Sequence, residues 1–209
     1  MSEPAGLRER KKQRTREAIA AAAIALFLER GFDQVSVADV AAAAEVSKRT
    51  LFKYFPSKED LVVQRFADHQ DESARHVRAR EPGESPLSAL HRGWLDALRR
   101  QDPISGLCDE PEVVRFYQLI TGTESLTARL RRFAEQSEAM LVAALTEAGY
   151  PPRRAQFVAV QFGALEVMLM GENSRAIASG RSAAEVYPEA VAALAEAIDL
   201  LRHGAESGN

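Results

Sequence analysis

The sequence has few of the residues and motifs on which catalytic and metal-binding proteins depend. It contains one cysteine, Cys108, which excludes an intrachain disulfide framework and a zinc site built from several cysteines. It also lacks a glycine-rich phosphate loop, a Gly-x-Ser-x-Gly motif and a His-Glu-x-x-His motif. We therefore expect a protein that is not an enzyme and that holds no cofactor and no metal ion.

A membrane-spanning run is missing as well. The apolar stretch Ala18–Leu28 follows the basic run Arg8–Arg16 and so imitates a secretory signal. This stretch is well short of the roughly 20 residues that cross a bilayer. Glu29–Asp33 follow it where a signal would have a small-residue cleavage site. We expect neither a signal peptide nor a membrane partner.

Strand-like alternation of apolar and polar residues is not convincing anywhere, whereas apolar residues recur at helical spacing almost throughout. The hydrophobic share of 46% is ample for a buried core. The sequence predicts an all-α fold of about nine helices. The later helices are expected, between proline and glycine clusters, at about 86–100, 110–120, 125–149, 152–179 and 184–203.

Capping signals divide the first eighty residues into four helices. The first helix ends at Gly31, and the second begins at the capping-box pair Ser36 and Asp39. Ser47 starts a very short third helix, and Ser57 with Asp60 starts a fourth that is expected to run to about Arg80. The inward residues would be Ile19, Ala23, Leu26 and Phe27 in the first helix, Val37, Val40, Ala41 and Ala44 in the second, and Leu51 and Phe55 in the third.

Residues 44–46 form a short turn between the second and third helices, which is the spacing of a helix-turn-helix. Arginine and lysine can bond guanine O6 and N7 in a major groove, and threonine or phenylalanine can contact a thymine methyl group. An isolated lysine is usually only solvated, so a prediction of DNA binding depends on several such residues lying together on one helix face. The outward face of the third helix carries Lys48, Arg49, Phe52 and Lys53, flanked by Thr50 and Tyr54.

Charge is distributed unevenly along the chain. Residues 1–66 carry 12 Lys and Arg against 9 Asp and Glu, a net charge of +3. Residues 67–209 carry 15 against 21, a net charge of −6. A basic head on an acidic body is expected when only the head meets a polyanion, although such an asymmetry also arises by chance.

The segment Thr15–Leu61 closely resembles the DNA-binding domain of the tetracycline-repressor (TetR) family. The matching features are the alanine-rich first helix that ends in Leu-Phe before Arg30–Phe32, the segment Val35–Val37 leading into Val40 and Ala41, and Leu51–Phe55 followed by Ser57–Leu61. The chain is also similar to a subgroup of this family that includes regulators of the mycofactocin system, some of which respond to fatty acyl thioesters.

The resemblance implies a transcriptional repressor that binds a palindromic operator as a homodimer, with paired third helices in successive major grooves. By that resemblance, Lys48, Arg49, Thr50 and Phe52 would lie in the groove, while Ser36, Tyr54 and Lys58 would hold phosphates. Many family members have an aromatic residue at Lys53, which therefore either reaches a phosphate or faces solvent. The complete predicted DNA-binding set is Ser36, Ser47, Lys48, Arg49, Thr50, Phe52, Lys53, Tyr54 and Lys58.

We predict a DNA-binding domain over residues 1–60 and a domain for ligand binding and dimerisation over residues 61–209. A basic arm is expected before the first helix, where it would reach an adjacent minor groove or remain a solubilising tail. Its residues are Arg8, Arg10, Lys11, Lys12, Arg14 and Arg16.

An effector pocket in the second domain would be largely apolar with a few polar groups. The effector would be an acyl thioester or another small apolar molecule, such as a drug, a hormone-like molecule or an antibiotic intermediate. The candidate residues, each also explained by core packing, are Trp94, Phe116, Tyr117, Phe133, Met140, Phe162 and Met170, with Glu166 or Asn173 as the polar group.

The helix from Pro152 is apolar on two faces and therefore needs two partners. Residues 152–179 and 184–203 are expected to form the homodimer interface; burial of both helices inside one subunit is the alternative. The two faces of the first of these helices are Phe157, Ala164 and Met168, and Phe162, Leu165 and Leu169. The stripe of the last helix is Val191, Leu194, Ile198 and Leu201.

Two further possibilities stay open. His69, Glu72 and His76 share one face of the predicted fourth helix and could bind zinc, but their highly charged surroundings favour solvated or core histidines. A helical interaction module that does not bind DNA would be expected to have an inert third helix.

The regulator would be cytoplasmic in a bacterium, and associated with the nucleoid when bound to its operator.

Overall fold

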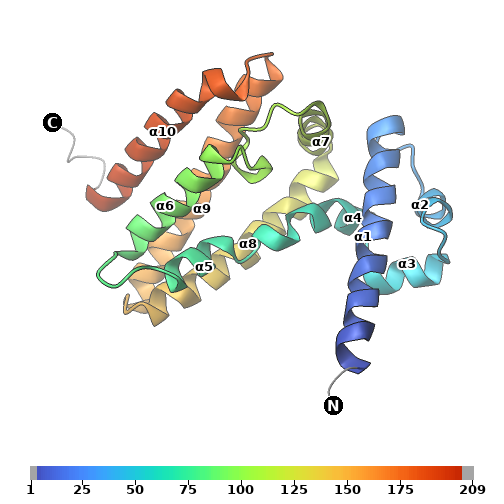
Figure 1. The fold of residues 1–209 in the computed structure, drawn as a ribbon, viewed down its shortest axis with the longest axis horizontal. Coiled ribbons are helices and arrows are strands. Elements are labelled where there is room, and N and C mark those ends of the chain that lie inside the picture. The colour runs from blue at the N-terminus through green and yellow to red at the C-terminus, as the bar shows by residue number, and fades with distance from the viewer. Residues whose placement is uncertain (1–3, 204–209) are drawn as a thin grey trace. The chain divides into compact units, whose positions relative to one another are not determined.

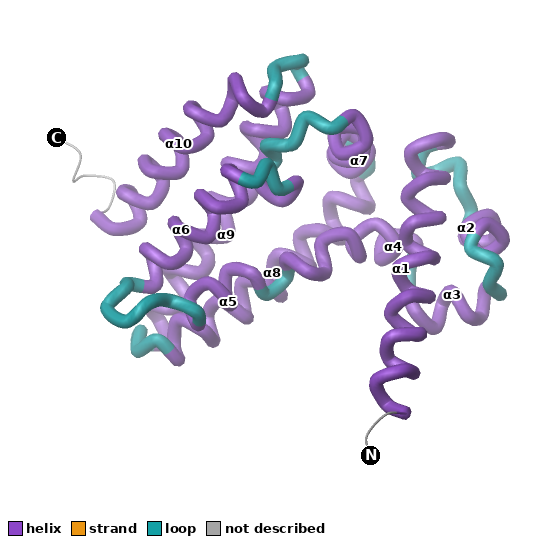
Figure 2. The backbone as a smooth tube through the Cα atoms, viewed as in Figure 1, coloured by secondary structure: helices purple, strands orange, loops and turns teal. Residues whose placement is uncertain are grey.

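The computed structural model describes residues 4–203, and within that range the regular secondary structure is entirely helical (Figure 2). The predicted all-α fold is confirmed. The nine predicted helices correspond to ten α-helices in this range, because the predicted fourth helix is interrupted. No helix of the described range is both long enough and apolar enough to cross a membrane.

The described chain divides into two compact units. Unit 1 comprises the residues up to Ala67 together with Arg115–Leu130, and unit 2 comprises Asp68–Val114 together with the residues from Arg131 onward. Two helices contain residues of both units: α7 (Pro111–Thr121) and α8 (Glu124–Glu147). The predicted functional boundary near residue 60 remains a prediction.

Helix α1 (Pro4–Arg30) is the element of unit 1 against which α2 (Val37–Ala43) and α4 (Lys58–Val63) pack, and α2 in turn contacts α3 (Lys48–Tyr54) (Figure 1). Ser36 and Asp39 form the predicted capping box of α2, and Ser57 and Asp60 form that of α4. The core of unit 1 includes the fully buried side chains of Ile19, Phe27, Val40, Leu51, Phe55 and Leu61.

The turn between α2 and α3 is a Schellman motif. The Val46 N–H donates to the Ala41 carbonyl at 2.9 Å, and the Glu45 N–H donates to the Ala42 carbonyl at 3.1 Å. Glu45 occupies the left-handed position of this motif with φ of 53°, where a glycine is usual. The predicted turn over residues 44–46 is therefore confirmed, and it holds a residue type that is strained in this conformation.

The prediction of one continuous helix from Ser57 to about Arg80 is wrong. Helix α4 ends at Val63, a 3-10 helix spans Gln64–His69, and α5 (Glu72–Arg78) follows. The interruption coincides with the passage between units, since Phe66 is buried in unit 1 whereas Ala74 and Val77 are buried in unit 2. At the break the Arg75 guanidinium donates to the Asp68 carbonyl at 2.9 Å. Capping patterns and helical periodicity do not contain this long-range information.

Unit 2 is built around α6 (Pro86–Arg99), α9 (Pro152–Ala178) and α10 (Ala183–His203). Helix α10 contacts both α6 and α9, α5 packs against α6, and the 3-10 turn Pro103–Ser105 contacts α6 and α9 (Figure 1). The core includes the buried side chains of Leu90, Leu98, Leu107, Leu145 and Leu194. The five later predicted helices all lie within two residues of the observed ones.

Helix α9 has the predicted two apolar faces, and they differ in burial. Phe162 and Leu169 are buried in the core of unit 2, and Leu165 packs against that core. Phe157 and Met168, which lie on the other face, are 54% and 46% exposed. One face of α9 therefore stabilises unit 2, and the other lacks a covering element within the described chain.

The left-handed turn yields a stability prediction. Replacing Glu45 with glycine removes the contact between Cβ and the carbonyl that penalises this conformation, so Glu45→Gly should raise the free energy of unfolding by about 1 kcal/mol. Urea denaturation followed by circular dichroism measures the change. Glu45→Ala deletes the same charge but keeps Cβ, and should give no such increase. An equal gain in both variants would show that charge and not backbone strain is responsible.

Candidate nucleic-acid interface

Helix α3 exposes one face and buries the other. Leu51, in its middle, and Phe55, at its C-terminal cap, are fully buried, as predicted. Lys48, Arg49 and Lys53 are exposed, and Phe52 is an exposed large hydrophobic side chain at 49%. About half of the Phe52 side chain is therefore in solvent, on the same short helix as three exposed cations. This face has the composition expected of a surface that contacts base edges.

The cations of this face form no close ion pair within the described chain, although the charge of Lys48 adds to the lowering of the pKa of Asp39. Among the described residues, Lys48, Arg49 and Lys53 make no side-chain hydrogen bond and no ion pair with one another or with an acidic residue. Other exposed arginines of the chain do form such pairs, for example Arg78 with Glu147 at 2.8 Å. The cations of α3 can therefore meet an anionic ligand without first breaking a hydrogen bond or a close ion pair.

The hydroxyl-bearing residues of the predicted set are more constrained. Ser47 caps α3: its Oγ accepts from the Thr50 N–H at 3.0 Å and lies 2.8 Å from Thr50 Oγ1. Ser36 donates its hydroxyl proton to Asp39 Oδ2 at 2.6 Å, and this hydrogen bond lowers the pKa of Asp39. Thr50 and Tyr54 are half-buried. The serines therefore fix the starts of α2 and α3 in the structure.

Lys58 differs from the exposed lysines. Its ammonium group donates to the Phe32 carbonyl, lies 4.2 Å from the centre of the Phe32 ring and 5.6 Å from that of Phe27, and its side chain is half-buried. These contacts hold the start of α4 against the end of α1. The family resemblance predicted that Lys58 holds a phosphate, and the sequence gave no signal of this second environment.

The basic segment expected before the first helix is part of that helix, which corrects the prediction of an arm. Helix α1 begins at Pro4, so the residues from Arg10 to Arg16 are helical. Arg16 donates to the Gln64 side chain, and its guanidinium lies 5.1 Å from the centre of the Phe55 ring. Arg16 is thus a packing residue of unit 1, whereas Arg10, Lys11, Lys12 and Arg14 are exposed.

The predicted effector residues fall into two groups. Phe116 and Tyr117 belong to unit 1, where they form an aromatic cluster with Phe66 at centroid distances of 5.9 to 6.5 Å. The others lie in unit 2. Trp94 and Phe162 are buried in its core, Met170 packs against that core, Phe133 is half-buried and Met140 is 38% exposed. Asn173 is buried and donates to the Ser105 carbonyl at 2.8 Å.

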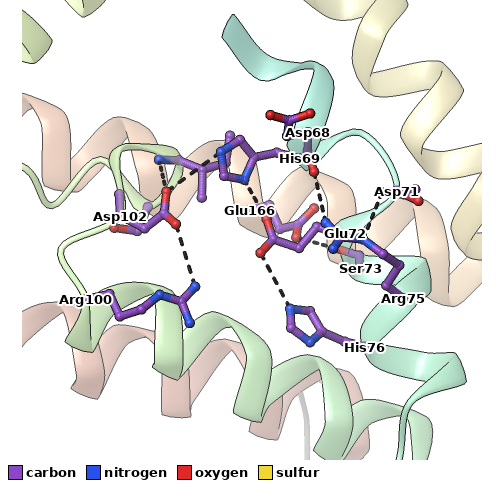
Figure 3. A network of polar contacts seen from close by, with 12 residues as sticks. Asp68, His69, Asp71, Glu72, Ser73, Arg75, His76, Arg100, Asp102 and Glu166 are labelled. Atoms are coloured by element: carbon purple, nitrogen blue, oxygen red, sulfur yellow. Dashed lines mark hydrogen bonds and ion pairs between the residues drawn. The ribbon is translucent and has the colours of Figure 1, made fainter. Parts of the chain in front are cut away.

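Glu166, the proposed polar group, lies in a polar network of unit 2 (Figure 3). Ser73 donates to Glu166 Oε1 at 2.8 Å. Burial raises the pKa of Glu166 from its ordinary value of 4.5 to about 7, and the neighbouring Glu72 carboxylate adds to the rise. At neutral pH this carboxyl is therefore divided between its acidic and ionised forms, which is uncommon for glutamate.

The same network contains the histidine cluster identified in the sequence (Figure 3). The two oxygens of Glu72 face His69 Nδ1 at 2.7 Å and His76 Nε2 at 3.8 Å. These contacts lower the pKa of Glu72, and the hydrogen bond with Glu72 raises the pKa of His69. Asp102, which sequence analysis missed, lies 3.9 Å from His69 Nε2. No group of three or more metal-ligating side chains within residues 4–203 has the arrangement of a metal site.

Glu166 gives a prediction about pH. As pH rises from about 4.5 to about 7, the unfolded chain loses this proton while the folded chain retains it, so folding stability falls and then levels off. Glu166→Gln keeps an acceptor for Ser73 and removes the cost of ionisation. It should raise the free energy of unfolding at pH 8 by about 2 to 3 kcal/mol and leave it unchanged at pH 4.5.

Urea denaturation at the two pH values measures this difference. Glu172→Gln, which neutralises an exposed carboxylate of the same helix, serves as the matched control and should have little effect at either pH. If Glu166→Gln changes stability equally at pH 4.5 and pH 8, the carboxyl does not titrate as described.

Comparison with known proteins connects this geometry to a family. The sequence model described as "Bacterial regulatory proteins, tetR family" matches residues 19–64. The transcriptional regulator TcmR of Streptomyces glaucescens is 31% identical over 138 residues, which are 65% of this chain and 61% of TcmR. The match therefore spans less than two thirds of that relative.

Two further similarities agree with it. A Mycobacterium tuberculosis protein named as a mycofactocin biosynthesis transcriptional regulator, MftR, is 42% identical over 60 residues, 29% of this chain and 30% of that protein. A TetR transcriptional regulator from Rhodococcus sp. RHA1 has a similar solved structure, with a TM-score of 0.54 and 26% identity, covering 92% of this chain and 97% of the other. Residues 19–64 therefore match the sequence of the TetR family of bacterial regulatory proteins, and the fold of the described chain is similar to that of a solved TetR regulator.

Proposed function

We propose that this protein is a ligand-responsive transcriptional regulator that binds duplex DNA through α3 and acts as a repressor. The observation that carries the proposal is the exposed face of α3, which combines an exposed phenylalanine with cations that form no close ion pair in the described chain. A surface of this kind has little use in packing, because the hydrophobic side of α3 is already buried. It combines the two elements of base readout, charged donors and an apolar contact.

In this proposal α3 lies in the major groove. Lys48 and Arg49 donate to guanine O6 and N7, Phe52 contacts thymine methyl groups, and Thr50 lies against the same base edges. Ser36, Ser47, Lys53 and Tyr54 contact phosphates at the edge of the groove. Lys58 uses one of its three N–H donors on the Phe32 carbonyl, which holds α4 in position, and the other donors can meet a phosphate.

The regulator is proposed to act as a homodimer through α9 and α10. Exposed apolar side chains recur along α9 at positions 157, 160, 164, 167 and 168, which is the spacing of one helical face. Leu200 adds an exposed apolar side chain on α10. A two-fold axis would pair this surface with its own copy, which is how most homodimers bury an isologous patch.

The effector is proposed to bind unit 2 near Glu166, with an acyl thioester or another small apolar molecule as its chemical class. Release from DNA requires the effector to bind the form of the dimer that does not fit the operator more tightly than the form that does. The continuous helix expected from Ser57 to about Arg80 is interrupted, so the change would be transmitted through α7 and α8, which each contain residues of both units.

Replacing Arg49, which is proposed to contact guanine, provides the direct test of DNA binding through α3. The purified full chain should bind a duplex from its own upstream DNA tightly, with a steep loss of affinity as salt increases, and should bind a scrambled duplex weakly. Arg49→Ala should lose about 1 to 3 kcal/mol on the native duplex and lose its preference for it. Fluorescence anisotropy at two salt concentrations measures both changes.

Arg99→Ala, which removes an exposed arginine of unit 2, is the matched control and should bind as the unmodified protein does. Weak, equal binding to both duplexes would direct the search for the operator to a selection from genomic fragments. If no genomic fragment binds, the regulator proposal fails and a helical interaction module becomes the better interpretation.

The dimer proposal has its own test. Val167 is 56% exposed on the outward face of α9, so Val167→Arg should place two like charges in the paired surface and yield a folded monomer. Size-exclusion chromatography with light scattering measures the mass. Met140→Arg alters an exposed apolar residue of α8 and should remain dimeric. A Val167→Arg protein of unchanged dimeric mass would locate the interface elsewhere.

A further inference from the structure

Helix α1 extends well beyond the part of it that packs. Its first fully buried residue is Ile19, and Thr15 and Arg16 are half-buried. Residues 9–14 are all exposed, which is nearly two turns of helix with no contribution to the core of unit 1. A solvent-facing extension of this length is not required by the packing of α1 against α2 and α4.

The extension is strongly basic and its charge is mostly unpaired. Glu9 is the single acid among residues 9–16, and it is paired with Lys12 at 3.2 Å. Arg10, Lys11 and Arg14 make no side-chain hydrogen bond or ion pair with any described residue. Three cations of this helix thus form no ion pair with the described residues, and Glu17, one turn after Arg14, accepts instead from the Gln13 side chain at 2.8 Å.

The position of this basic extension is defined within unit 1. The Arg16 guanidinium lies over Phe55, the residue that caps the C-terminal end of α3. With a rise of 1.5 Å per residue, Arg14, Lys11 and Arg10 lie about 3 to 9 Å further along the axis of α1. Figure 1 shows α1 continuing past the end of α3 in this direction. The exposed Lys53 in the last turn of α3 extends the basic surface toward the groove-reading face.

The helical form of the extension decides which part of DNA it fits. An α-helix with its side chains is about 10 to 12 Å wide, whereas the minor groove of B-form DNA is about 6 Å wide. The extension therefore cannot enter a minor groove as a flexible arm does. A helix carrying cations beside a groove-reading element fits the phosphate backbone next to that groove.

A membrane surface is the less suitable anionic partner. Helices that lie on a bilayer carry an apolar face opposite the basic one. Residues 9–18 offer only the small side chain of Ala18 as an exposed apolar group. The surface matches a partner that presents charge alone.

We propose that Arg10, Lys11 and Arg14 bind backbone phosphates of duplex DNA just outside the segment contacted by α3, and so add affinity that does not depend on base sequence. This inference rests on the proposed DNA-binding function. It assigns the extension of α1 a role separate from that of α3. Helix α3 selects the base sequence, whereas α1 lengthens the stretch of DNA that the protein contacts and increases the salt dependence of binding.

The test compares the full chain with the triple variant Arg10→Gln/Lys11→Gln/Arg14→Gln, because glutamine keeps a high helix propensity. Each protein is titrated with a long upstream duplex, a long scrambled duplex and an upstream duplex trimmed to the region under α3, over several salt concentrations. The triple variant should lose at least tenfold in affinity for both long duplexes and keep its preference between them. Its slope of log K against log salt should fall by about 0.9 for each lost phosphate contact.

On the trimmed duplex the two proteins should bind equally. The control triple variant Arg99→Gln/Arg131→Gln/Arg132→Gln removes the same charge from exposed sites of unit 2 and should retain the full slope. An unchanged slope in the α1 variant, while Arg49→Ala still loses its sequence preference, would overturn this inference and leave the proposed function intact. Failure of the unmodified chain to bind any duplex would overturn both.

Binding to anionic vesicles is measured in parallel, with phosphatidylglycerol and phosphatidylcholine in equal amounts. The unmodified chain and the triple variant should both fail to bind them. Vesicle binding that requires the three cations, without any effect on DNA, would assign the extension to a membrane and overturn the inference.

Discussion

The burial of Leu51 and Phe55 is the constraint on which the exposed face of α3 depends. Helix α3 has only seven residues, and a helix of that length has little stability of its own in water. Because Leu51 and Phe55 are fully buried against unit 1, α3 has one rotation about its axis, and that rotation directs Arg49 and Phe52 into solvent. The caps at Ser47 and the Schellman turn at Glu45 define where the helix starts, while the core defines which face it shows.

Basic residues of unit 1 that look alike in sequence serve different physical purposes. Arg16 and Lys58 each lie against aromatic rings and donate to a neighbouring element, so their charge holds α1, α3 and α4 together. Such cation–ring contacts are stronger when partly desolvated. The exposed cations of α3 and of the α1 extension have no such partners, so their charge acts outward. Unit 1 thus uses one residue class both to stabilise its core and to present a positive surface.

In unit 2 the apolar side chains form the core, and several ionisable side chains form a separate polar network. The core of α6, α9 and α10 consists of aliphatic and aromatic side chains, while Glu72, Glu166 and the two histidines are gathered into one network beside α5. Burial of a carboxyl group without a cation is costly, which is why Glu166 has a raised pKa. A group of this kind can accept or donate a hydrogen bond near neutral pH, and so it is suited to orient a polar group on an otherwise apolar guest.

Much of the architecture was determined by local sequence. The caps at Ser36, Ser47 and Ser57, the turn at residues 44–46 and the ends of the five later helices follow from residue types that act on their immediate neighbours. The two apolar faces of α9 were also predictable, because periodicity places Phe162 and Met168 on different sides of any helix. The composition of the α3 face was readable for the same reason.

Other features depended on contacts that no local pattern contains. Only the tertiary structure interrupted the helix after Val63, since Phe66 and Ala74 are buried in different units. In the tertiary structure the expected arm is also part of a helix, Lys58 donates to the Phe32 carbonyl, and Phe116 packs with Phe66 in unit 1. Sequence fixes what each side chain can do within a turn or two of its own helix. Long-range packing decides which distant residue a side chain contacts. It therefore also decides whether a cation supports the core or is exposed to a ligand.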